Sequence, residues 1–377
     1  MSLASIVAML LFFSSKETIE YPQPSPPPPT MDPPPPPAPV VPPPPPTFLP
    51  PPPPPAPAHL PPPPAPVPPP PPPPPPPAPV AFNCASAKSE TNFYIDSTMQ
   101  AIRVERELRN SGNIKDADTL QRISCRPQGT WIIGDDMTFV VSRVSSVMSR
   151  AGQEGTIPLL VLYNIPDHTT LRYWSGVQAG QDYRNWVTSV AETIGNREAW
   201  IVLEPDSIGL VSNLSKADQT TRLADLKSAI LILKEKAPRA RIYLDAGHSN
   251  WRSVGSVALN LEEAGIEHAH GFSTNVSNYQ FLADEIEYGR AVSELVGGKH
   301  FIVDTSRNGK GPHKTEWCNA PGVAIGRAPT TQTGQSFIDA FLWVKLPGES
   351  DGPCNGGVPT GKFWTERALE MIRTSPY

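Results

Sequence analysis

The stretch AWIVLEPDS at residues 199–207 indicates the kind of fold to expect. Its apolar part, Trp200–Leu203, is typical of a strand that is buried on both faces of a parallel sheet. The strand ends at two acids, Glu204 and Asp206, and functional sites in α/β domains form where parallel strands end. Asp206 is therefore a candidate for chemistry. The alternative is that Asp206 only caps the helix that follows.

From residue 130 onward, apolar strand patterns alternate with amphipathic helix patterns. The predicted strands are Thr130–Ile133, Pro158–Tyr163, Trp200–Leu203, Arg241–Leu244, His270–Thr274, His300–Val303 and Ile338–Lys345. The predicted helices are Met137–Met148, Asp182–Ile194, Ala217–Glu235, Trp251–Ala264 and Phe281–Leu295. This order predicts parallel strands, and about seven of them favour an α/β barrel over a doubly wound sheet. No glycine-rich nucleotide-binding motif accompanies them.

Three segments of different composition are predicted along the chain. Residues 1–20 include the apolar run Leu3–Phe13, which is typical of a signal peptide, with a retained membrane anchor as the alternative. Residues 21–81 hold most of the 52 prolines and predict a disordered stalk, although their P-x-x-P content also suits an SH3 or WW ligand. Residues 82–377 are globular in composition and predict one catalytic domain.

Charge and cysteine content narrow the class of protein. The formal charge of −5 and the pI near 5.8, without a basic cluster, argue against a nucleic-acid partner. The four cysteines show no zinc spacing, and their even number predicts two disulfides in an exported protein. Three pairings are open, of which the simplest joins neighbours in sequence. The cysteines are Cys84, Cys125, Cys318 and Cys354.

Four predicted strands each end near an aspartate: Asp206, Asp245, Asp304 and Asp351. If the strands are parallel, these acids gather on one face. Two carboxyl groups in a cleft, one protonated and one ionised, are what glycoside hydrolysis requires. Metal binding is the competing use of clustered acids, but no calcium-loop or H-E-x-x-H motif is present. We therefore expect no metal and no cofactor.

Aromatic residues near these acids favour a sugar ligand. Trp251 follows Asp245, Trp317 precedes Cys318, and Tyr163 ends the second predicted strand, where the next loop begins. Flat rings stack on the apolar faces of pyranose units, while neighbouring polar groups bind the hydroxyls.

Six motifs in order resemble glycoside hydrolase family 6, and in particular its bacterial endoglucanases. That family comprises endo-β-1,4-glucanases and cellobiohydrolases, and the resemblance implies a distorted, roughly seven-stranded parallel α/β barrel from about residue 90 onward. The motifs are LEPD at 203–206, LDAGH at 244–248 with Trp251, TNVSNY at 274–279, VDTSRNG at 303–309, WCN at 317–319 and KLPGESDG at 345–352.

The resemblance also implies roles for individual residues. It makes Asp206 the general acid, Asp351 the candidate base and Asp245 a supporting acid, in a reaction that inverts the anomeric centre. In this family a relay can activate the water instead of direct contact with the base. The candidate substrate-binding residues are Tyr163, Ser175, His248, Trp251, Asn275, Trp317, Lys345 and Glu349.

One motif departs from the family pattern. Where the family has Y-x-x-P-x-R-D-C, this chain has YNIPDHTT at residues 163–170, so that Thr169 replaces an Asp and Thr170 replaces a disulfide Cys. The second cysteine of that bridge is also missing, from residues 211–215. Loss of the Asp removes a negative charge that would raise the pKa of Asp206, which predicts weak activity or a lower pH optimum. Asp167 is a candidate substitute only if the loop is rebuilt.

Loop lengths and the amino-terminal segments complete the expectation. The segments after Thr169 and Asp351 are short, which predicts an open cleft and internal cleavage of β-1,4-glucan rather than cellobiohydrolase action. The expected location is outside the cell or at its surface, with wall or membrane tethering through the amino-terminal segment. The alternative is a catalytically impaired glucan-binding protein of the cell wall. A third reading makes the proline tract the working part.

Overall fold

The computed structural model describes Cys84, residues 91–166 and residues 180–377. The predicted signal segment, the proline-rich stalk, Asp167, Thr169, Thr170 and Ser175 lie outside the described residues. The seven strands run parallel in one sheet whose spatial order is the order of the chain. They are β1 (Thr130–Ile132), β2 (Leu159–Leu162), β3 (Ala199–Leu203), β4 (Ala240–Asp245), β5 (Gly271–Thr274), β6 (His300–Asp304) and β7 (Ile338–Leu342).

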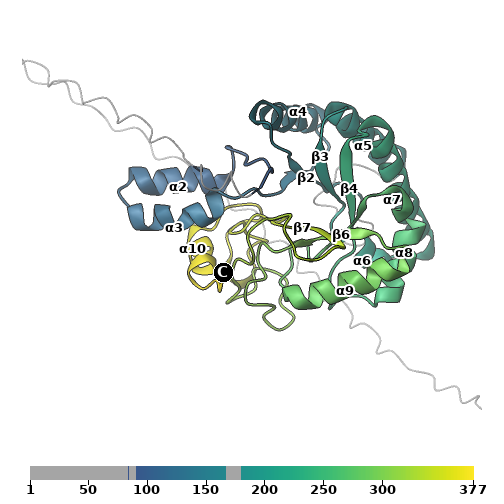
Figure 1. Cartoon of the computed structure of the whole chain (residues 1–377). Coiled ribbons are helices and arrows are strands. Elements are labelled where there is room, and N and C mark those ends of the chain that lie inside the picture. The colour runs from purple at the N-terminus through teal and green to yellow at the C-terminus, as the bar shows by residue number, and fades with distance from the viewer. Residues whose placement is uncertain (1–83, 85–90, 167–179) are drawn as a thin grey trace, which may run out of the picture. The chain divides into compact units, whose positions relative to one another are not determined.

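The sheet curls into the incomplete, seven-stranded α/β barrel that the sequence predicted (Figure 1). Edge strands β1 and β7 approach each other where Gly129 N–H donates a 2.9 Å hydrogen bond to the carbonyl of Trp343. An added Cβ at Gly129 would lie 2.3 Å from the carbonyl oxygen of Val344, so glycine permits this approach.

Both faces of the sheet are buried, as the continuous apolar runs predicted. Along β3, Trp200 and Val202 belong to a cluster on the inner face, with Tyr243 and Ile302 from neighbouring strands. Alternate residues such as Ile201 belong to the cluster beneath the outer helices. A one-residue shift in the register of β3 would therefore place apolar side chains on both faces again. Only the acids at the end of the strand would bring polar groups into the core.

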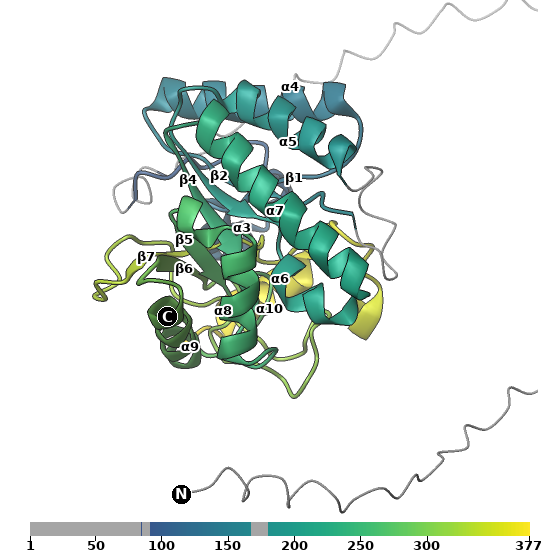
Figure 2. The ribbon, with the colours of Figure 1, turned by 90° about the vertical axis from the view of Figure 1, so that its right-hand side faces the viewer.

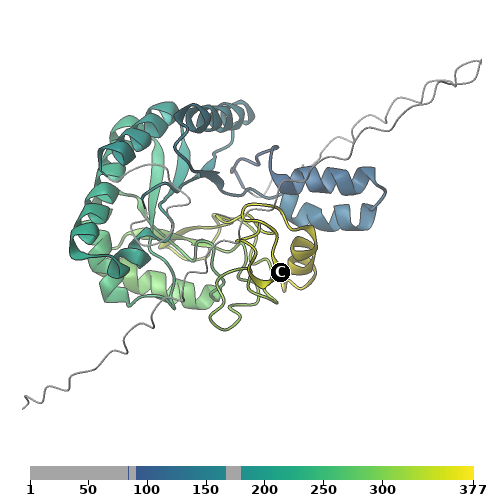
Figure 3. The same cartoon turned by 180° about the vertical axis from the view of Figure 1, so that it is seen from behind.

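Five helices cover the outer face, in an arc that Figures 1 and 3 show from opposite sides. They are α4 (Met137–Glu154), α5 (Gln181–Ile194), α7 (Lys216–Lys236), α8 (Val254–Glu263) and α9 (Leu282–Leu295). Figure 2 looks onto this arc, with α7 and α8 in front of the strands. One boundary differs from expectation: the helix predicted from Trp251 begins at Val254, because Ser253 is its N-cap and accepts from Ser256 N–H. Trp251 is thereby left in a loop.

Three further helices lie across the strands from that arc (Figures 1 and 3), and a third hydrophobic cluster packs them. They are α2 (Gln100–Asn110), α3 (Ile114–Ser124) and α10 (Thr365–Arg373). Disulfides join Cys84 to Cys125 at the end of α3, and Cys318 to Cys354 between the β6–β7 loop and the segment after β7. In the described part of the chain, no helix has the length and apolar character needed to cross a membrane.

Candidate functional site

Asp206 sits in a strained turn at the carboxyl end of β3. Glu204 and Asp206 have positive φ angles of 49° and 68°, in a backbone region that residues other than glycine rarely adopt. Such strain persists only where the surroundings impose it, and it is concentrated at functional sites. The turn passes directly into α6 (Ser207–Leu210), with Asp206 at the N-cap position of that helix. Asp206 is half-buried, and no described residue is hydrogen-bonded to its carboxyl group.

Two effects raise the pKa of Asp206 to about 6. The larger is burial among surrounding protein atoms, and the smaller is the negative charge of Asp351. Asp206 therefore keeps its proton in mildly acidic solution, as a general acid must. The sequence analysis predicted that Thr169, in place of an Asp, would leave the pKa of Asp206 lower. Thr169 lies outside the described residues, and the causes that raise the pKa of Asp206 are burial and Asp351.

Asp245 supports Asp206 from the end of β4. Its Oδ2 accepts hydrogen bonds from the backbone N–H of Asp206 at 2.8 Å and of Gly247 at 3.2 Å, and its Oδ1 accepts from the Ser273 hydroxyl at 3.1 Å. Burial, followed by the charge of Asp206, raises the pKa of Asp245 well above its usual value. Asp245 therefore holds the strained Asp206 turn in place through the hydrogen bond from the Asp206 N–H.

Asp351 is surrounded by donors and positive charge. Its Oδ2 accepts from Arg307 Nη1 at 2.7 Å, from Asn319 N–H at 3.0 Å and from the Tyr279 hydroxyl at 3.2 Å. Lys345 Nζ lies 3.6 Å from its Oδ1. Burial raises the pKa of Asp351, but Arg307 and Lys345 outweigh it, and the net pKa lies below the usual range. Asp206 and Asp351 thus have pKa values that are shifted in opposite directions.

Glu204, which the sequence marked only as part of a motif, joins β2 to β3. It is fully buried and accepts hydrogen bonds from the backbone N–H groups of Asn164 and Ile165 and from the hydroxyl of Tyr183. Burial raises its pKa to about 7 against the effect of these donors. Glu204 therefore fixes the exit of β2, where Tyr163 is located.

Asp304 fixes three loops at once. Its fully buried carboxylate accepts four backbone hydrogen bonds, from the N–H groups of Ser277, Ser306, Val344 and Lys345, at 2.8 to 3.3 Å. Burial raises the pKa of Asp304, and the N–H donors act in the opposite direction. The sequence placed this acid at a strand end but gave no sign that its carboxylate faces inward.

Asn275, a predicted substrate-binding residue, is also turned inward. Its side chain is fully buried, donates to the Asp304 carbonyl at 2.8 Å and accepts from Gln280 N–H at 3.0 Å. Its φ of 64° places it, like Asp206, in a strained position.

Trp251 packs directly against the helix that follows Asp206. A Cβ added at Gly209 of α6 would lie 2.5 Å from the indole ring, and one added at Gly247 would lie 2.9 Å from it. His248 stacks on the indole at 5.5 Å between ring centroids, and the Arg252 guanidinium lies 5.9 Å from its centre. Burial lowers the pKa of His248 to about 4, so this imidazole is neutral at neutral pH.

A second aromatic surface lies at the ends of β1, β2 and β7. Tyr163 meets Trp131 edge-on at 5.5 Å, and Lys345 Nζ lies 5.8 Å from the Trp131 ring centre. Lys345 also donates to Glu349 Oε1 at 2.8 Å. Our sequence analysis missed Trp131, although an aromatic residue inside the predicted strand Thr130–Ile133 was a usable signal.

Trp317 is the most exposed of the predicted aromatics, with 69% of its surface accessible. It precedes Cys318, whose disulfide to Cys354 ties this loop to the segment after Asp351. Asn319 strengthens the connection, since its Oδ1 accepts from Asp351 N–H and its own N–H donates to Asp351.

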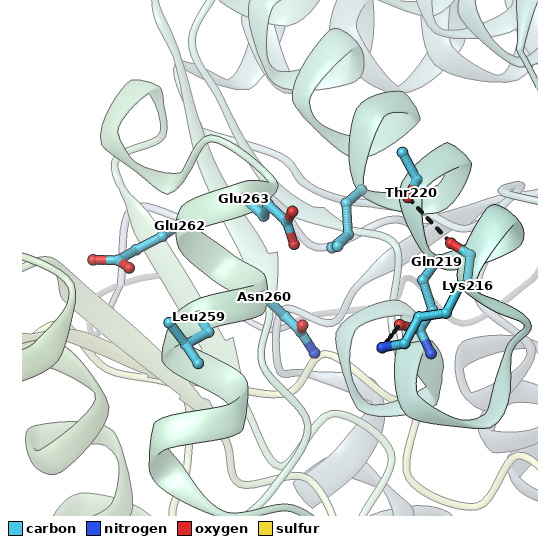
Figure 4. A pocket seen from close by; sticks show the side chains of 8 residues that line it. Lys216, Gln219, Thr220, Leu259, Asn260, Glu262 and Glu263 are labelled. Atoms are coloured by element: carbon cyan, nitrogen blue, oxygen red, sulfur yellow. Dashed lines mark hydrogen bonds between the residues drawn. The ribbon is translucent and has the colours of Figure 1, made fainter.

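One cavity lies away from these residues. A depression of about 560 Å³ lies between α7 and α8 on the outer face, and Figure 4 shows Lys216, Gln219 and Glu263 on its walls. It contains none of the predicted site residues. Within the described ranges, no group of three or more His, Cys, Asp or Glu side chains is placed to hold a metal ion.

Comparison with known proteins gives consistent results. The sequence model of "Glycosyl hydrolases family 6" matches residues 88–374. Endoglucanase A of Cellulomonas fimi is 40% identical over 287 residues, which cover 76% of this chain but only 62% of that protein. The 1,4-beta-D-glucan cellobiohydrolase C of Emericella nidulans is 34% identical over 239 residues, 51% of this chain. Among solved structures, the endoglucanase Cel6 of Mycobacterium tuberculosis, in complex with methyl-cellobiosyl-4-deoxy-4-thio-beta-D-cellobioside, superposes with a TM-score of 0.70 at 35% identity, over 77% of this chain and 99% of that one.

Proposed function

Because the chain belongs to glycosyl hydrolase family 6, we propose that it is an endo-β-1,4-glucanase that hydrolyses internal bonds of β-1,4-glucan with inversion. The observation that carries this proposal is the pair Asp206 and Asp351, whose pKa values are shifted in opposite directions by burial and by neighbouring cations. One carboxyl group that holds its proton and one that is ionised are the two groups an inverting glycosidase needs.

In the proposed reaction, Asp206 donates its proton to the glycosidic oxygen as the bond to the anomeric carbon breaks. A water molecule attacks that carbon from the opposite face and loses a proton to the base. Asp351 is our candidate base, and Oδ1 is the accepting atom, because Oδ2 already accepts from three donors. A low pKa makes Asp351 a weak base, so its stronger contribution is to orient the water.

The remaining predicted residues divide by their environment. Trp251, Trp317 and the Trp131–Tyr163 pair offer rings for stacking on sugars, while His248, Lys345 and Glu349 offer polar groups for the hydroxyls. The buried Asn275 would support its loop instead of touching the sugar. Ser175 is kept as a candidate from the sequence alone.

Internal cleavage is favoured over chain-end cleavage by the short segment after Asp351. That segment folds back on itself, since Ser350 N–H donates to the Lys362 carbonyl and Gly361 N–H donates to Ser350. The greater identity to an endoglucanase than to a cellobiohydrolase agrees with this choice. The second candidate function, glucan binding without turnover, is favoured by Thr169 in place of the family's Asp.

The two disulfides support export from the cell, because such bonds persist in oxidising compartments. We propose that residues 1–20 direct export or anchor the chain, that residues 21–81 form a spacer, and that residues 82–377 form the catalytic domain.

The test is release of reducing ends from carboxymethylcellulose between pH 4 and 8. We expect activity in the natural protein, its loss in Asp206→Ala, and higher activity or a higher pH optimum in Thr169→Asp. Binding of cellotetraose without hydrolysis, together with rescue by Thr169→Asp, would support the second candidate. Absence of both binding and hydrolysis in every form would rule out both.

A further inference from the structure

Two side chains on one face of α9 hold the loop that follows β4. Tyr288 donates a 2.8 Å hydrogen bond to the carbonyl of Ala246, and Glu285 Oε1 accepts a 2.9 Å hydrogen bond from Ser249 N–H. The two residues are three positions apart and so lie on the same side of the helix. The bonded backbone groups lie on either side of Gly247 and His248. The loop from 246 to 252 is thus fixed from α9 at two points.

The same loop is fixed on its other side to α6, the helix that follows Asp206. Arg252 Nε donates to the Gly209 carbonyl at 2.8 Å, and the Trp251 ring packs on Gly209 itself. The loop therefore lies between α9 and α6, and a displacement on the α9 side would move the ring that packs on the Asp206 turn.

We propose that Glu285 is a positioning residue that places Trp251 and His248 for sugar binding through its hydrogen bond to the loop backbone. This proposal rests on the proposed function for the identity of the ligand. Glu285 itself is fully buried and does not touch the sugar.

A carboxyl group at this position is costly, which argues against a simple packing role. Glu285 has no exposed surface, and burial raises its pKa to about 7 although the Ser249 N–H and the nearby Ser249 and Thr274 hydroxyls lower it. Among the described residues it has no ion pair; the charged group beside it in sequence is Asp284, which raises the pKa further. An apolar side chain would fill the space without this cost but would leave Ser249 N–H without an acceptor.

The experiment uses the full chain with Glu285→Ala, which removes the acceptor, and Glu285→Gln, which keeps an oxygen for Ser249 N–H. Glu105→Gln is the matched control, because Glu105 is also a buried helical acid, on α2, bonded to Arg109. Three quantities are measured: hydrogen exchange of the peptide containing residues 246–252, the Kd for cellotetraose, and kcat and KM on a soluble glucan.

We expect Glu285→Ala to speed exchange in that peptide and to raise Kd and KM about tenfold, the equivalent of about 1.4 kcal/mol, with kcat changed less than twofold. Glu285→Gln should restore most of the affinity, and Glu105→Gln should change none of the three quantities. In a Trp251→Ala background, Glu285→Ala should raise Kd much less, because the ring it positions is absent.

Unchanged exchange in Glu285→Ala, or equal effects on Kd with and without Trp251, would overturn the proposal. Failure of the proposed function has a different signature, since the natural protein would then neither bind nor hydrolyse glucan. Hydrogen exchange would still report in that case whether Glu285 holds the loop, and only the ligand assignment would be lost.

Discussion

The backbone N–H of Asp206 donates a 2.8 Å hydrogen bond to Oδ2 of Asp245, so the first strand-end acid is held in place by the second. The donor belongs to a residue with a φ of 68°, and the acceptor is fully buried at the end of β4. The strained turn at the end of β3 is therefore imposed by a side chain from the neighbouring strand.

Replacing Asp245 tests this relationship. Asp245→Ala removes the acceptor for two backbone N–H groups, of Asp206 and Gly247, and we expect a loss of about 1–3 kcal/mol in the free energy of unfolding. Asp245→Asn keeps an oxygen in place and should lose less than half as much. Urea denaturation of both variants checks this, and equal losses would contradict the supporting role.

Asp206→Asn should stabilise the protein at neutral pH while it abolishes activity. The folded protein holds the Asp206 proton more tightly than the unfolded chain, because the pKa rises from 3.8 to about 6. The resulting stability is complete below pH 3.8 and is lost as the pH rises through 6. Since Asn does not ionise, the variant should gain up to about 3 kcal/mol over the natural protein at pH 7.5 and much less near pH 4. Denaturation at the two pH values checks the sign, and a variant that is less stable at pH 7.5 would contradict it.

Arg307→Met should weaken both the fold and the low pKa of Asp351. Breaking a buried ion pair by removing one partner costs about 3–5 kcal/mol, because the other charge is left buried. Loss of the cation should raise the pKa of Asp351, so the acidic limb of the kcat/KM profile should move to higher pH. Arg307→Lys keeps a positive charge and is the control. An acidic limb that stays in place in Arg307→Met would exclude Asp351 as its origin.

The two disulfides should differ in function although they enclose similar lengths of chain. Their sequence separations are 36 and 41 residues, so replacing either pair by serine should cost roughly 2–4 kcal/mol. Only loss of Cys318–Cys354 should also raise KM, because that bridge holds the Trp317 loop beside Asp351. Thermal denaturation and Michaelis–Menten kinetics of the two double variants check this, and an equal rise of KM in both would contradict it.

All seven strands and the five covering helices could be predicted from the sequence, because their apolar periodicity is strong and the strands are buried on both faces. The pair α2 and α3 was missed, although Ala101, Ile102 and Glu105 mark one buried face of α2 at helical spacing. These helices precede the first strand, and the alternation of strand and helix that organised the prediction does not include them.

The site was less predictable than the fold. The strand-end acids were found, but their sequence context did not distinguish Asp206, whose half-buried carboxyl group has no hydrogen-bond partner among the described residues, from Asp304, whose carboxylate is fully buried with four donors. The direction of a side chain at a strand end depends on loop conformation, which local sequence does not determine. Glu285 shows the same limit, since nothing in an amphipathic helix pattern marks a buried acid as a partner of a distant backbone N–H.

The four backbone hydrogen bonds to Asp304 also limit how the loops of this protein can be exchanged to change its specificity. Barrel enzymes usually acquire new specificities when one strand-end loop is exchanged independently of the others. Here the loops after β5 and β6 and the end of β7 share one carboxylate, so a graft into any of them alters the hydrogen bonding of the other two. Grafts should therefore transfer the three segments together.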